Sequence, residues 1–217
     1  MTGTIHDQRF DKIVSLGTDC TVGLAFKALE VKAETYPFDW IVNHHRWLRA
    51  QFEQRLPWQI DGDALEVQDP ASPQILADEA AGAYYYHDFT ADRPVAEQLP
   101  EIQAKYRRRA DRLNDLLDSG RRVLFLRTAR ENSRYPEPVG AGTSAQLGEL
   151  AEIIEARYPN ADFHLLMLYA ETGETPTHPR VTRLRVAGDK IGFRRDIRRH
   201  LDRLFASQRE HAAARQG

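Results

Sequence analysis

Short, continuous apolar runs recur along the 217-residue chain and predict buried strands. Phe10–Leu16, Val123–Leu126 and Phe163–Tyr169 are rich in branched and aromatic residues, which is typical of strands that are covered on both faces. Val181–Val186 alternates between apolar and polar residues, and therefore predicts a strand at the edge of a sheet.

Amphipathic stretches separate these runs and predict helices. Apolar residues recur three and four positions apart in Glu101–Asp118 and in Phe193–Phe205, so each of these helices would bury one face. The same spacing predicts a helix at Thr21–Glu30 and another that starts near Ser144. By contrast, residues 56–82 contain several prolines and glycines, and predict an irregular segment with at most short strands.

The order of these elements predicts the fold class. Strands alternate with helices in the second half of the chain, which is typical of βαβ units and a parallel sheet. We therefore predict an α/β fold with three layers and a mostly parallel sheet, similar to Rossmann-like or SGNH-like folds. No linker divides the chain, so residues 1–217 are expected to form a single α/β domain, with a core at about 10–206 and a polar, frayed tail at 207–217.

Composition and charge exclude several classes of function. The formal net charge of −2 argues against a nucleic-acid partner, and no apolar run reaches the length of about 20 residues that a membrane span needs. A single cysteine cannot form an internal disulfide, and the first residues are polar, so we expect a cytoplasmic protein. The motifs of nucleotide, dinucleotide and zinc sites are missing, and we expect no cofactor and no metal. The expected partner is a small-molecule or peptide substrate, and the sequence indicates no particular oligomeric state.

Cys20 is the main candidate for chemistry. It follows the first predicted strand and a Gly17-Thr18 turn, close to the first turn of the next helix. The N-terminus of a helix favours negative charge, and therefore favours the thiolate form of a cysteine. Backbone N–H groups of Gly17 and Thr18 could then form an oxyanion hole. The alternative is that Cys20 is only a small buried hydrophobic residue.

A thiol nucleophile needs a base, and several of the eight histidines are candidates. His87 ends a tyrosine-rich strand, and the His44-His45 pair follows an aromatic block. Spacing alone does not separate these two possibilities. His164 lies inside a predicted strand and is expected to be a hydrogen-bonded histidine of the core or the sheet face.

Charged residues near the predicted strand ends are candidates for binding. Asp39 stands between two aromatic residues and could orient a histidine or bind a cation, or could form a buried pair. Arg127 follows the strand Val123–Leu126 and could hold a carboxylate or phosphate, or could pair with Asp39 or Asp88. Arg108 belongs to a run of three arginines that predicts a solvated helix face with one member turned inward.

Several motifs together resemble a bacterial family of unknown function that is labelled as putative papain-like cysteine peptidases. They are Ser15-Leu16-Gly17 followed by Cys20, Phe38-Asp39-Trp40, His87-Asp88-Phe89, Tyr106 with Arg107, Arg108 and Arg112, and Leu124-Phe125-Leu126-Arg127-Thr128. The resemblance extends from about Lys12 to the last helix. It weakens near Gly188–Phe193, where the family often has tryptophans and this chain has none.

The resemblance implies roles for particular residues. Cys20 would be the nucleophile, His87 the base, and Asp39 or Asp88 the third member of the site. It also implies a papain-like α+β fold, as an alternative to the three-layer fold that the order of elements favours.

Two functions follow from these observations. The first is a cysteine-dependent hydrolase or acyltransferase acting on a peptide, amide or thioester, with Arg127 and Arg108 contacting the substrate. The second is a non-catalytic domain that binds an anionic small molecule or glycan in a crevice around Arg127, His87 and Asp39. We expect the first, because the resemblance adds to the position of Cys20.

Overall fold

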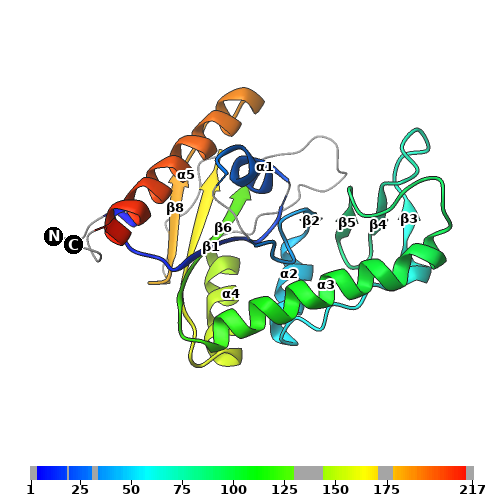
Figure 1. Ribbon diagram of the computed structural model, residues 1–217, viewed down its shortest axis with the longest axis horizontal. Helices are drawn as coiled ribbons and strands as arrows, with labels where there is room; N and C mark the ends of the chain where they lie inside the picture. Colours follow the sequence, from blue (N-terminus) through cyan, green and yellow to red (C-terminus); the bar gives the residue numbers. More distant parts are fainter. Residues whose placement is uncertain (1–3, 19, 31–33, 130–143, 171–177, 214–217) are drawn as a thin grey trace.

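The computed structural model describes residues 4–18, 20–30, 34–129, 144–170 and 178–213 (Figure 1). The elements within these residues are, in chain order, η1 (Ile5–Asp7), β1 (Lys12–Ser15), α1 (Thr21–Ala28), β2 (Ile41–Asn43), α2 (His45–Glu53), η2 (Gly62–Ala64), β3 (Glu66–Val67), β4 (Leu76–Asp78), β5 (Ala83–Tyr85), α3 (Val95–Asp118), β6 (Arg122–Ala129), α4 (Ser144–Arg157), β7 (Asp162–Tyr169), β8 (Val181–Arg185) and α5 (Lys190–Ala213). No helix in this part of the chain is both long enough and apolar enough to cross a membrane.

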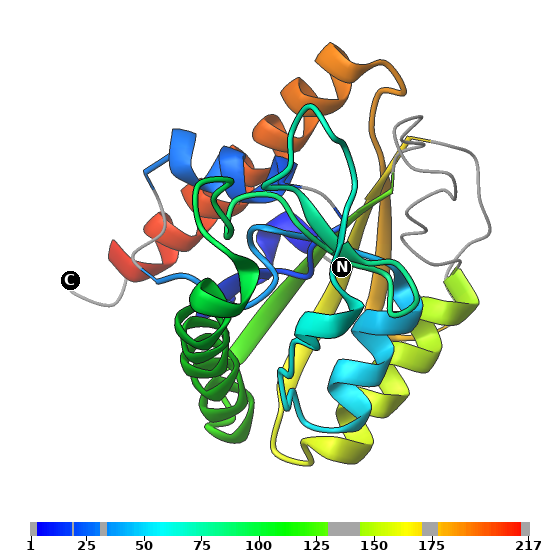
Figure 2. The same ribbon diagram turned by 90° about the vertical axis from the view of Figure 1, so that its right-hand side faces the viewer.

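A parallel sheet with the strand order β1-β6-β7-β8 forms the first half of the architecture. Side chains of a strand alternate between the two faces. Phe125 and Leu165 therefore join one core cluster with residues of α3 and α4, whereas Leu124 and Leu126 join a second cluster with residues of α1 and α5. Helices cover both faces of this sheet (Figure 1 and Figure 2). The predicted α/β class is confirmed, and β8 lies at the sheet edge as its alternating pattern predicts.

A second, antiparallel sheet with the order β2-β5-β4-β3 lies beside the first. The sequence does not predict it, because its strands are only two or three residues long and show no clear alternation. Tyr85 of β5 packs edge-on against Tyr106 of α3, with 6.0 Å between the ring centroids. Figure 1 shows α3 running alongside both sheets. The fold is therefore mixed α/β with two sheets, instead of one mostly parallel sheet.

A buried hydrogen-bond network joins the two sheets at the carboxyl end of β1. The carbonyl of Leu16 accepts from Nδ2 of Asn43 at 3.0 Å and from Nη1 of Arg127 at 2.9 Å. Arg127 also donates to Oδ1 of Asn43 at 2.8 Å. Since Leu16 follows β1, Asn43 ends β2 and Arg127 belongs to β6, the network fixes the antiparallel sheet against the edge of the parallel one.

The long helix α3 starts earlier than the sequence predicts. It begins at Val95 and continues through Pro100, whereas the predicted start is Glu101. Proline usually ends a helix, because it lacks an N–H donor, but Pro100 is exposed and the helix continues past it. The loop predicted at 132–142 lies outside the described residues.

The C-terminal helix is also longer than predicted. α5 continues to Ala213, so residues 207–213 of the predicted polar tail are helical. The side chain of Gln208 accepts a hydrogen bond from the N–H of Phe10 at 2.7 Å and donates to the carbonyl of Gln8 at 2.9 Å. These contacts fasten the segment to the N-terminal part of the chain, and correct the prediction of a frayed tail.

Candidate active site

Cys20 and His87 lie side by side, although 67 positions separate them in the sequence. Cys20 immediately precedes α1, at the end of the helix where the dipole is positive. His87 follows β5 of the antiparallel sheet, and its Nε2 atom lies 3.5 Å from Sγ of Cys20. The thiol is half-buried and the imidazole is exposed. A thiol next to an imidazole at a helix N-terminus is an arrangement that favours a nucleophilic thiolate.

A sharp turn before Cys20 sets the position of the thiol. The φ angles of Gly17 and Thr18 are 78° and 96°, a region that side chains with a β-carbon rarely adopt. A β-carbon on Gly17 would collide with the amide of Asn43, and the Gly17 N–H donates to Oγ of Ser15 at 3.2 Å. Gly17 and Thr18 are both buried and shape the turn. Their contact with a substrate stays a prediction.

Trp40 borders both members of the pair, although the sequence does not predict it as a site residue. Its carbonyl oxygen lies 3.8 Å from Sγ of Cys20, and its ring packs edge-on against the imidazole of His87, with 6.1 Å between centroids. The Phe-Asp-Trp motif was a sequence signal for this position. A tryptophan that remains half-exposed in such an apolar block indicates a surface that a ligand can use.

Asp39 lies one residue before Trp40 and holds the turn that carries it. Its Oδ2 atom accepts the backbone N–H of Tyr36 at 2.7 Å, and the residue is 1% exposed. The buried carboxylate therefore holds the turn that positions Trp40, and a catalytic role for Asp39 stays a prediction.

Asp88 supports the strand end that carries His87. Its carboxylate accepts from Nζ of Lys105 at 2.5 Å and from the hydroxyl of Tyr106 at 2.8 Å, and only 4% of its side chain is exposed. Burial, and then the neighbouring Asp88 carboxylate, raise the pKa of Tyr106 well above its usual value, so the phenol stays protonated and donates. In the described part of the chain, no hydrogen bond joins the His87 ring to Asp88 or Asp39.

Arg127 lies in the protein interior. The residue is 1% exposed and donates to the carbonyl of Leu16 and to Asn43, inside the network that joins the sheets. Burial lowers the pKa of Arg127 to about 9, so the guanidinium remains charged at neutral pH. These donors are directed at the protein interior, and binding of a substrate by Arg127 stays a prediction.

The other histidine candidates lie in different surroundings. His44 precedes α2 and stacks on Tyr84, with 5.7 Å between centroids. His45 is buried, and desolvation, followed by the charges of Arg127 and Arg49, lowers its pKa to about 4. His87 is thus the candidate that lies beside the thiol. His164 bonds to the hydroxyl of Thr182 at 2.8 Å, which confirms that it is a satisfied histidine of the sheet.

A pocket of about 330 Å³ opens beside His87. We call it the thiol pocket because His87 lies next to Cys20, although Cys20 itself does not line it. It is lined by Leu24, Trp40, His87, Asp88, Lys105 and Arg109. The pocket combines an apolar side chain, an imidazole and basic groups, a mixture that is common in ligand-binding sites.

Arg108 lies outside the thiol pocket, in an adjoining pocket on the same helix. The side chain is exposed, as is that of Arg107. The prediction of a solvated helix face holds for Arg107 and Arg108, whereas Arg109 is half-buried and lies over the Tyr106 ring.

Comparison with known proteins gives a family match. A model of the family described as "Putative papain-like cysteine peptidase (DUF1796)" matches residues 59–173, which is more than half of the chain. The matched segment includes His87 and Asp88, and Cys20 lies before it. Searches of the curated proteins and of the solved structures gave no match.

Proposed function

Since the chain belongs to the family of putative papain-like cysteine peptidases, we propose that it is a cysteine-dependent hydrolase or acyltransferase. Cys20 is the nucleophile and His87 is the general base. The observation that carries the proposal is the distance of 3.5 Å between Sγ of Cys20 and Nε2 of His87 at the N-terminus of α1. Acyl groups of peptides, amides or thioesters are the substrates that this chemistry suits.

The reaction begins with transfer of the thiol proton from Cys20 to Nε2 of His87. The thiolate then attacks the acyl carbonyl carbon, and the tetrahedral intermediate collapses to a thioester with Cys20. The leaving amine or thiol takes the proton from the imidazolium as it departs. In the second half, His87 takes a proton from water or from another molecule that accepts the acyl group. That molecule attacks the thioester carbonyl, and the departing sulfur of Cys20 takes the proton back from His87 and becomes a thiol again.

Three neighbouring groups support these steps. The positive end of α1 stabilises the thiolate in addition to the imidazolium. The Trp40 ring limits the movement of the imidazole by packing against it. Asp39 and Asp88 act as positioning residues, because Asp39 holds the turn before Trp40 and Asp88 anchors the strand end at His87.

The non-catalytic alternative is less well supported. It needs an anion-binding crevice formed by Arg127, His87 and Asp39, but Arg127 and Asp39 are each 1% exposed. The buried guanidinium is bonded to the protein, so it is not available to a ligand without rearrangement of the sheet junction.

Trapping of the acyl-enzyme tests the proposal. The purified protein is mixed with N-acetylglycine p-nitrophenyl ester, and intact mass spectrometry follows the mass gain at Cys20. We expect rapid acylation, a reduction of about 10²- to 10⁴-fold in His87→Ala, and no adduct in Cys20→Ala. Acylation at the same rate in His87→Ala, or at residues other than Cys20, would contradict the proposal.

The same assay separates the roles of the two carboxylates. We expect Asp39→Asn and Asp88→Asn to slow acylation less than His87→Ala, because neither carboxylate is bonded to the imidazole. A loss in Asp88→Asn as large as that in His87→Ala would show that Asp88 acts on the base directly. Circular dichroism of each variant checks that it is folded.

A further inference from the structure

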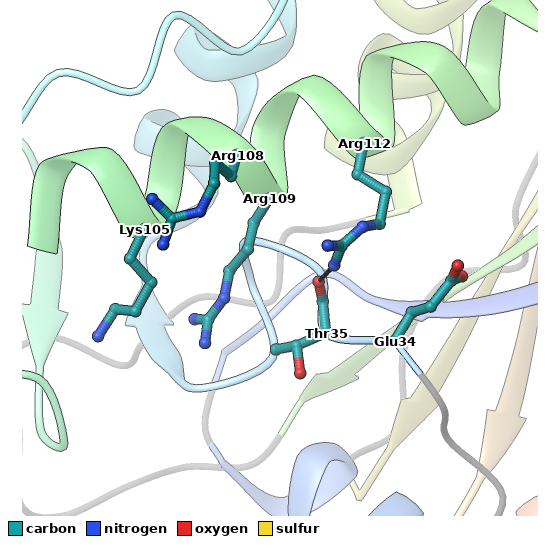
Figure 3. A pocket seen from close by; sticks show the side chains of 6 residues that line it. All are labelled: Glu34, Thr35, Lys105, Arg108, Arg109 and Arg112. Atoms are coloured by element: carbon teal, nitrogen blue, oxygen red, sulfur yellow. Dashed lines mark hydrogen bonds between the residues drawn. The ribbon is translucent and has the colours of Figure 1, made fainter.

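A basic pocket lies on α3 next to the thiol pocket, and the proposed chemistry does not use it. It has a volume of about 370 Å³, and we call it the arginine pocket. Its lining residues are Lys105, Arg108, Arg109, Arg112, Glu34 and Thr35. Figure 3 shows Arg109 and Arg112 extending from the helix toward the Glu34–Thr35 segment. The basic side chains follow the helical spacing of three and four residues, and so form one stripe along α3.

Two of the charged residues in the arginine pocket are neutralised by the protein. Nζ of Lys105 lies 2.5 Å from the buried carboxylate of Asp88. Glu34 is paired with Lys12 at 2.7 Å, and its pKa is lowered first by the hydrogen bond from Lys12. The pocket therefore gains no net negative charge from Glu34.

The three arginines keep their positive charge without a carboxylate partner. Arg109 lies over the ring of Tyr106, and Arg112 donates to the carbonyl of Thr35 at 2.7 Å. Among the residues that the structure describes, no carboxylate lies within salt-bridge distance of Arg108, Arg109 or Arg112. Like charges one turn apart repel each other on a helix, so an anion in this pocket would remove an unfavourable interaction.

The arginine pocket adjoins the thiol pocket. Lys105 and Arg109 line both, and Arg109 thus stands between Arg108 on one side and His87 on the other. Leu24, which is 47% exposed, gives the thiol pocket an apolar wall. Cys20 lies next to His87 of this pocket, so a group bound in the arginine pocket would be close to the candidate nucleophile.

We infer that the arginine pocket binds carboxylate groups of an acidic peptide substrate whose reacting carbonyl lies at Cys20. Guanidinium groups bind carboxylates through two parallel hydrogen bonds, which gives both affinity and geometry. The inference rests on the proposed function for the reaction, whereas the binding itself does not require turnover.

The binding test uses Cys20→Ala protein, so that no reaction occurs. The probes are an acetylated and amidated tetraglutamate peptide, the matching tetraglutamine peptide, and inorganic phosphate, each titrated by calorimetry at low and at high salt. We expect tetraglutamate to bind, tetraglutamine to bind at least 10-fold more weakly, and the affinity for tetraglutamate to fall as salt increases.

Variants on one helix locate the site. Arg108→Gln and Arg109→Gln should each weaken tetraglutamate binding by 5-fold or more, since each removes a charge from the pocket. Arg107→Gln is the matched control, because Arg107 is an exposed arginine of the same helix that does not line the pocket. Equal effects of Arg107→Gln and Arg108→Gln would overturn the inference, because general charge would then explain the binding.

The remaining outcomes distinguish the inference from the proposed function. Equal binding of tetraglutamate and tetraglutamine, or binding of phosphate alone, overturns the acidic-peptide site. Tetraglutamate should also slow alkylation of Cys20 by iodoacetamide in the wild-type protein, and a bound peptide that leaves alkylation unchanged overturns the continuity with Cys20. A third result is possible, in which tetraglutamate binds and slows alkylation of Cys20 but the protein forms no acyl-enzyme. This result would confirm the arginine pocket and contradict the proposed catalysis.

Discussion

Gly23 of α1 packs directly against the backbone carbonyl of Asp39. A β-carbon on Gly23 would lie 2.5 Å from that oxygen and 3.7 Å from Cε3 of Trp40. Because α1 begins next to Cys20 and Trp40 borders His87, this close approach sets the separation between the thiol and the wall of the site. The contact is with backbone, which cannot move aside as a flexible side chain can.

Gly23→Ala should therefore disturb the site as well as the packing. We expect it to destabilise the protein by about 1–3 kcal/mol, the usual cost of an overpacked contact, and to slow acylation of Cys20. Gly148→Ala on α4 is the control, because among the described residues its β-carbon would meet only the β-carbon of His178, at 3.6 Å, an ordinary contact. Urea unfolding measures the stability, and a Gly23→Ala protein that matches the wild type in both respects would contradict this packing.

Arg127 should contribute to stability at the junction of the sheets. Arg127→Met leaves the carbonyl of Leu16 with one donor fewer and Oδ1 of Asn43 without its guanidinium, so we expect a loss of at least about 2 kcal/mol in the free energy of unfolding. Arg127→Lys should recover only part of it, since lysine lacks the planar fork. If Arg127→Met unfolded like the wild type and lost only ligand binding, the residue would face a ligand after all.

Because His45 is buried, we expect the free energy of unfolding to decrease at acidic pH. Burial, then the charges of Arg127 and Arg49, lower the pKa of His45 from 6.5 to about 4. Between these two pH values the unfolded chain binds a proton that the folded protein does not, so the free energy of unfolding falls as the pH falls. The total effect is on the order of 3 kcal/mol, at about 1.4 kcal/mol per pKa unit.

Urea unfolding at pH 7 and pH 4.5 measures this effect. In His45→Gln, the difference in stability between the two pH values should be smaller than in the wild type. His164, whose pKa burial also lowers to about 4, should account for part of what remains. An unchanged difference in His45→Gln would show that His45 does not titrate in this range.

The parallel part of the fold could be predicted because its strands are buried on both faces. Runs such as Val123–Leu126 and Phe163–Tyr169 have no polar positions to confuse the pattern, apart from His164. The antiparallel sheet could not be predicted, since its strands are only two or three residues long and Ile41–Asn43 pairs with a strand that is distant in sequence, Ala83–Tyr85. Local sequence does not encode that pairing.

Cys20 and His87 could be identified as candidates from the sequence, but their arrangement and the place of Trp40 beside them could not. Cys20 follows from the turn and the helix start, and His87 was favoured over His44 and His45 by the motif resemblance. The two meet because β2 and β5 pair, which brings the end of one sheet to the start of α1. Arg127 directly follows the predicted strand Val123–Leu126, but only the structure shows that it belongs to β6 and donates to Leu16 and Asn43.

The arginine pocket could be predicted only in part. The run of three arginines that includes Arg108 is visible in the sequence and predicts a solvated helix face. The opposite wall comes from Glu34 and Thr35, which are far away in sequence. The spacing of the arginines was therefore recognisable, but the cavity that they line was not.

The pH dependence of Cys20 alkylation by iodoacetamide tests the central claim most directly. The rate is measured from pH 5 to pH 9 in the wild type, in His87→Ala, and in His178→Ala as a histidine control before β8, at the other edge of the parallel sheet. We predict fast alkylation near pH 6 in the wild type and in His178→Ala, well below the pKa of about 8.5 of a free thiol, and loss of this reactivity in His87→Ala. Alkylation that rises only near pH 8.5 in all three proteins would contradict a catalytic Cys20–His87 pair.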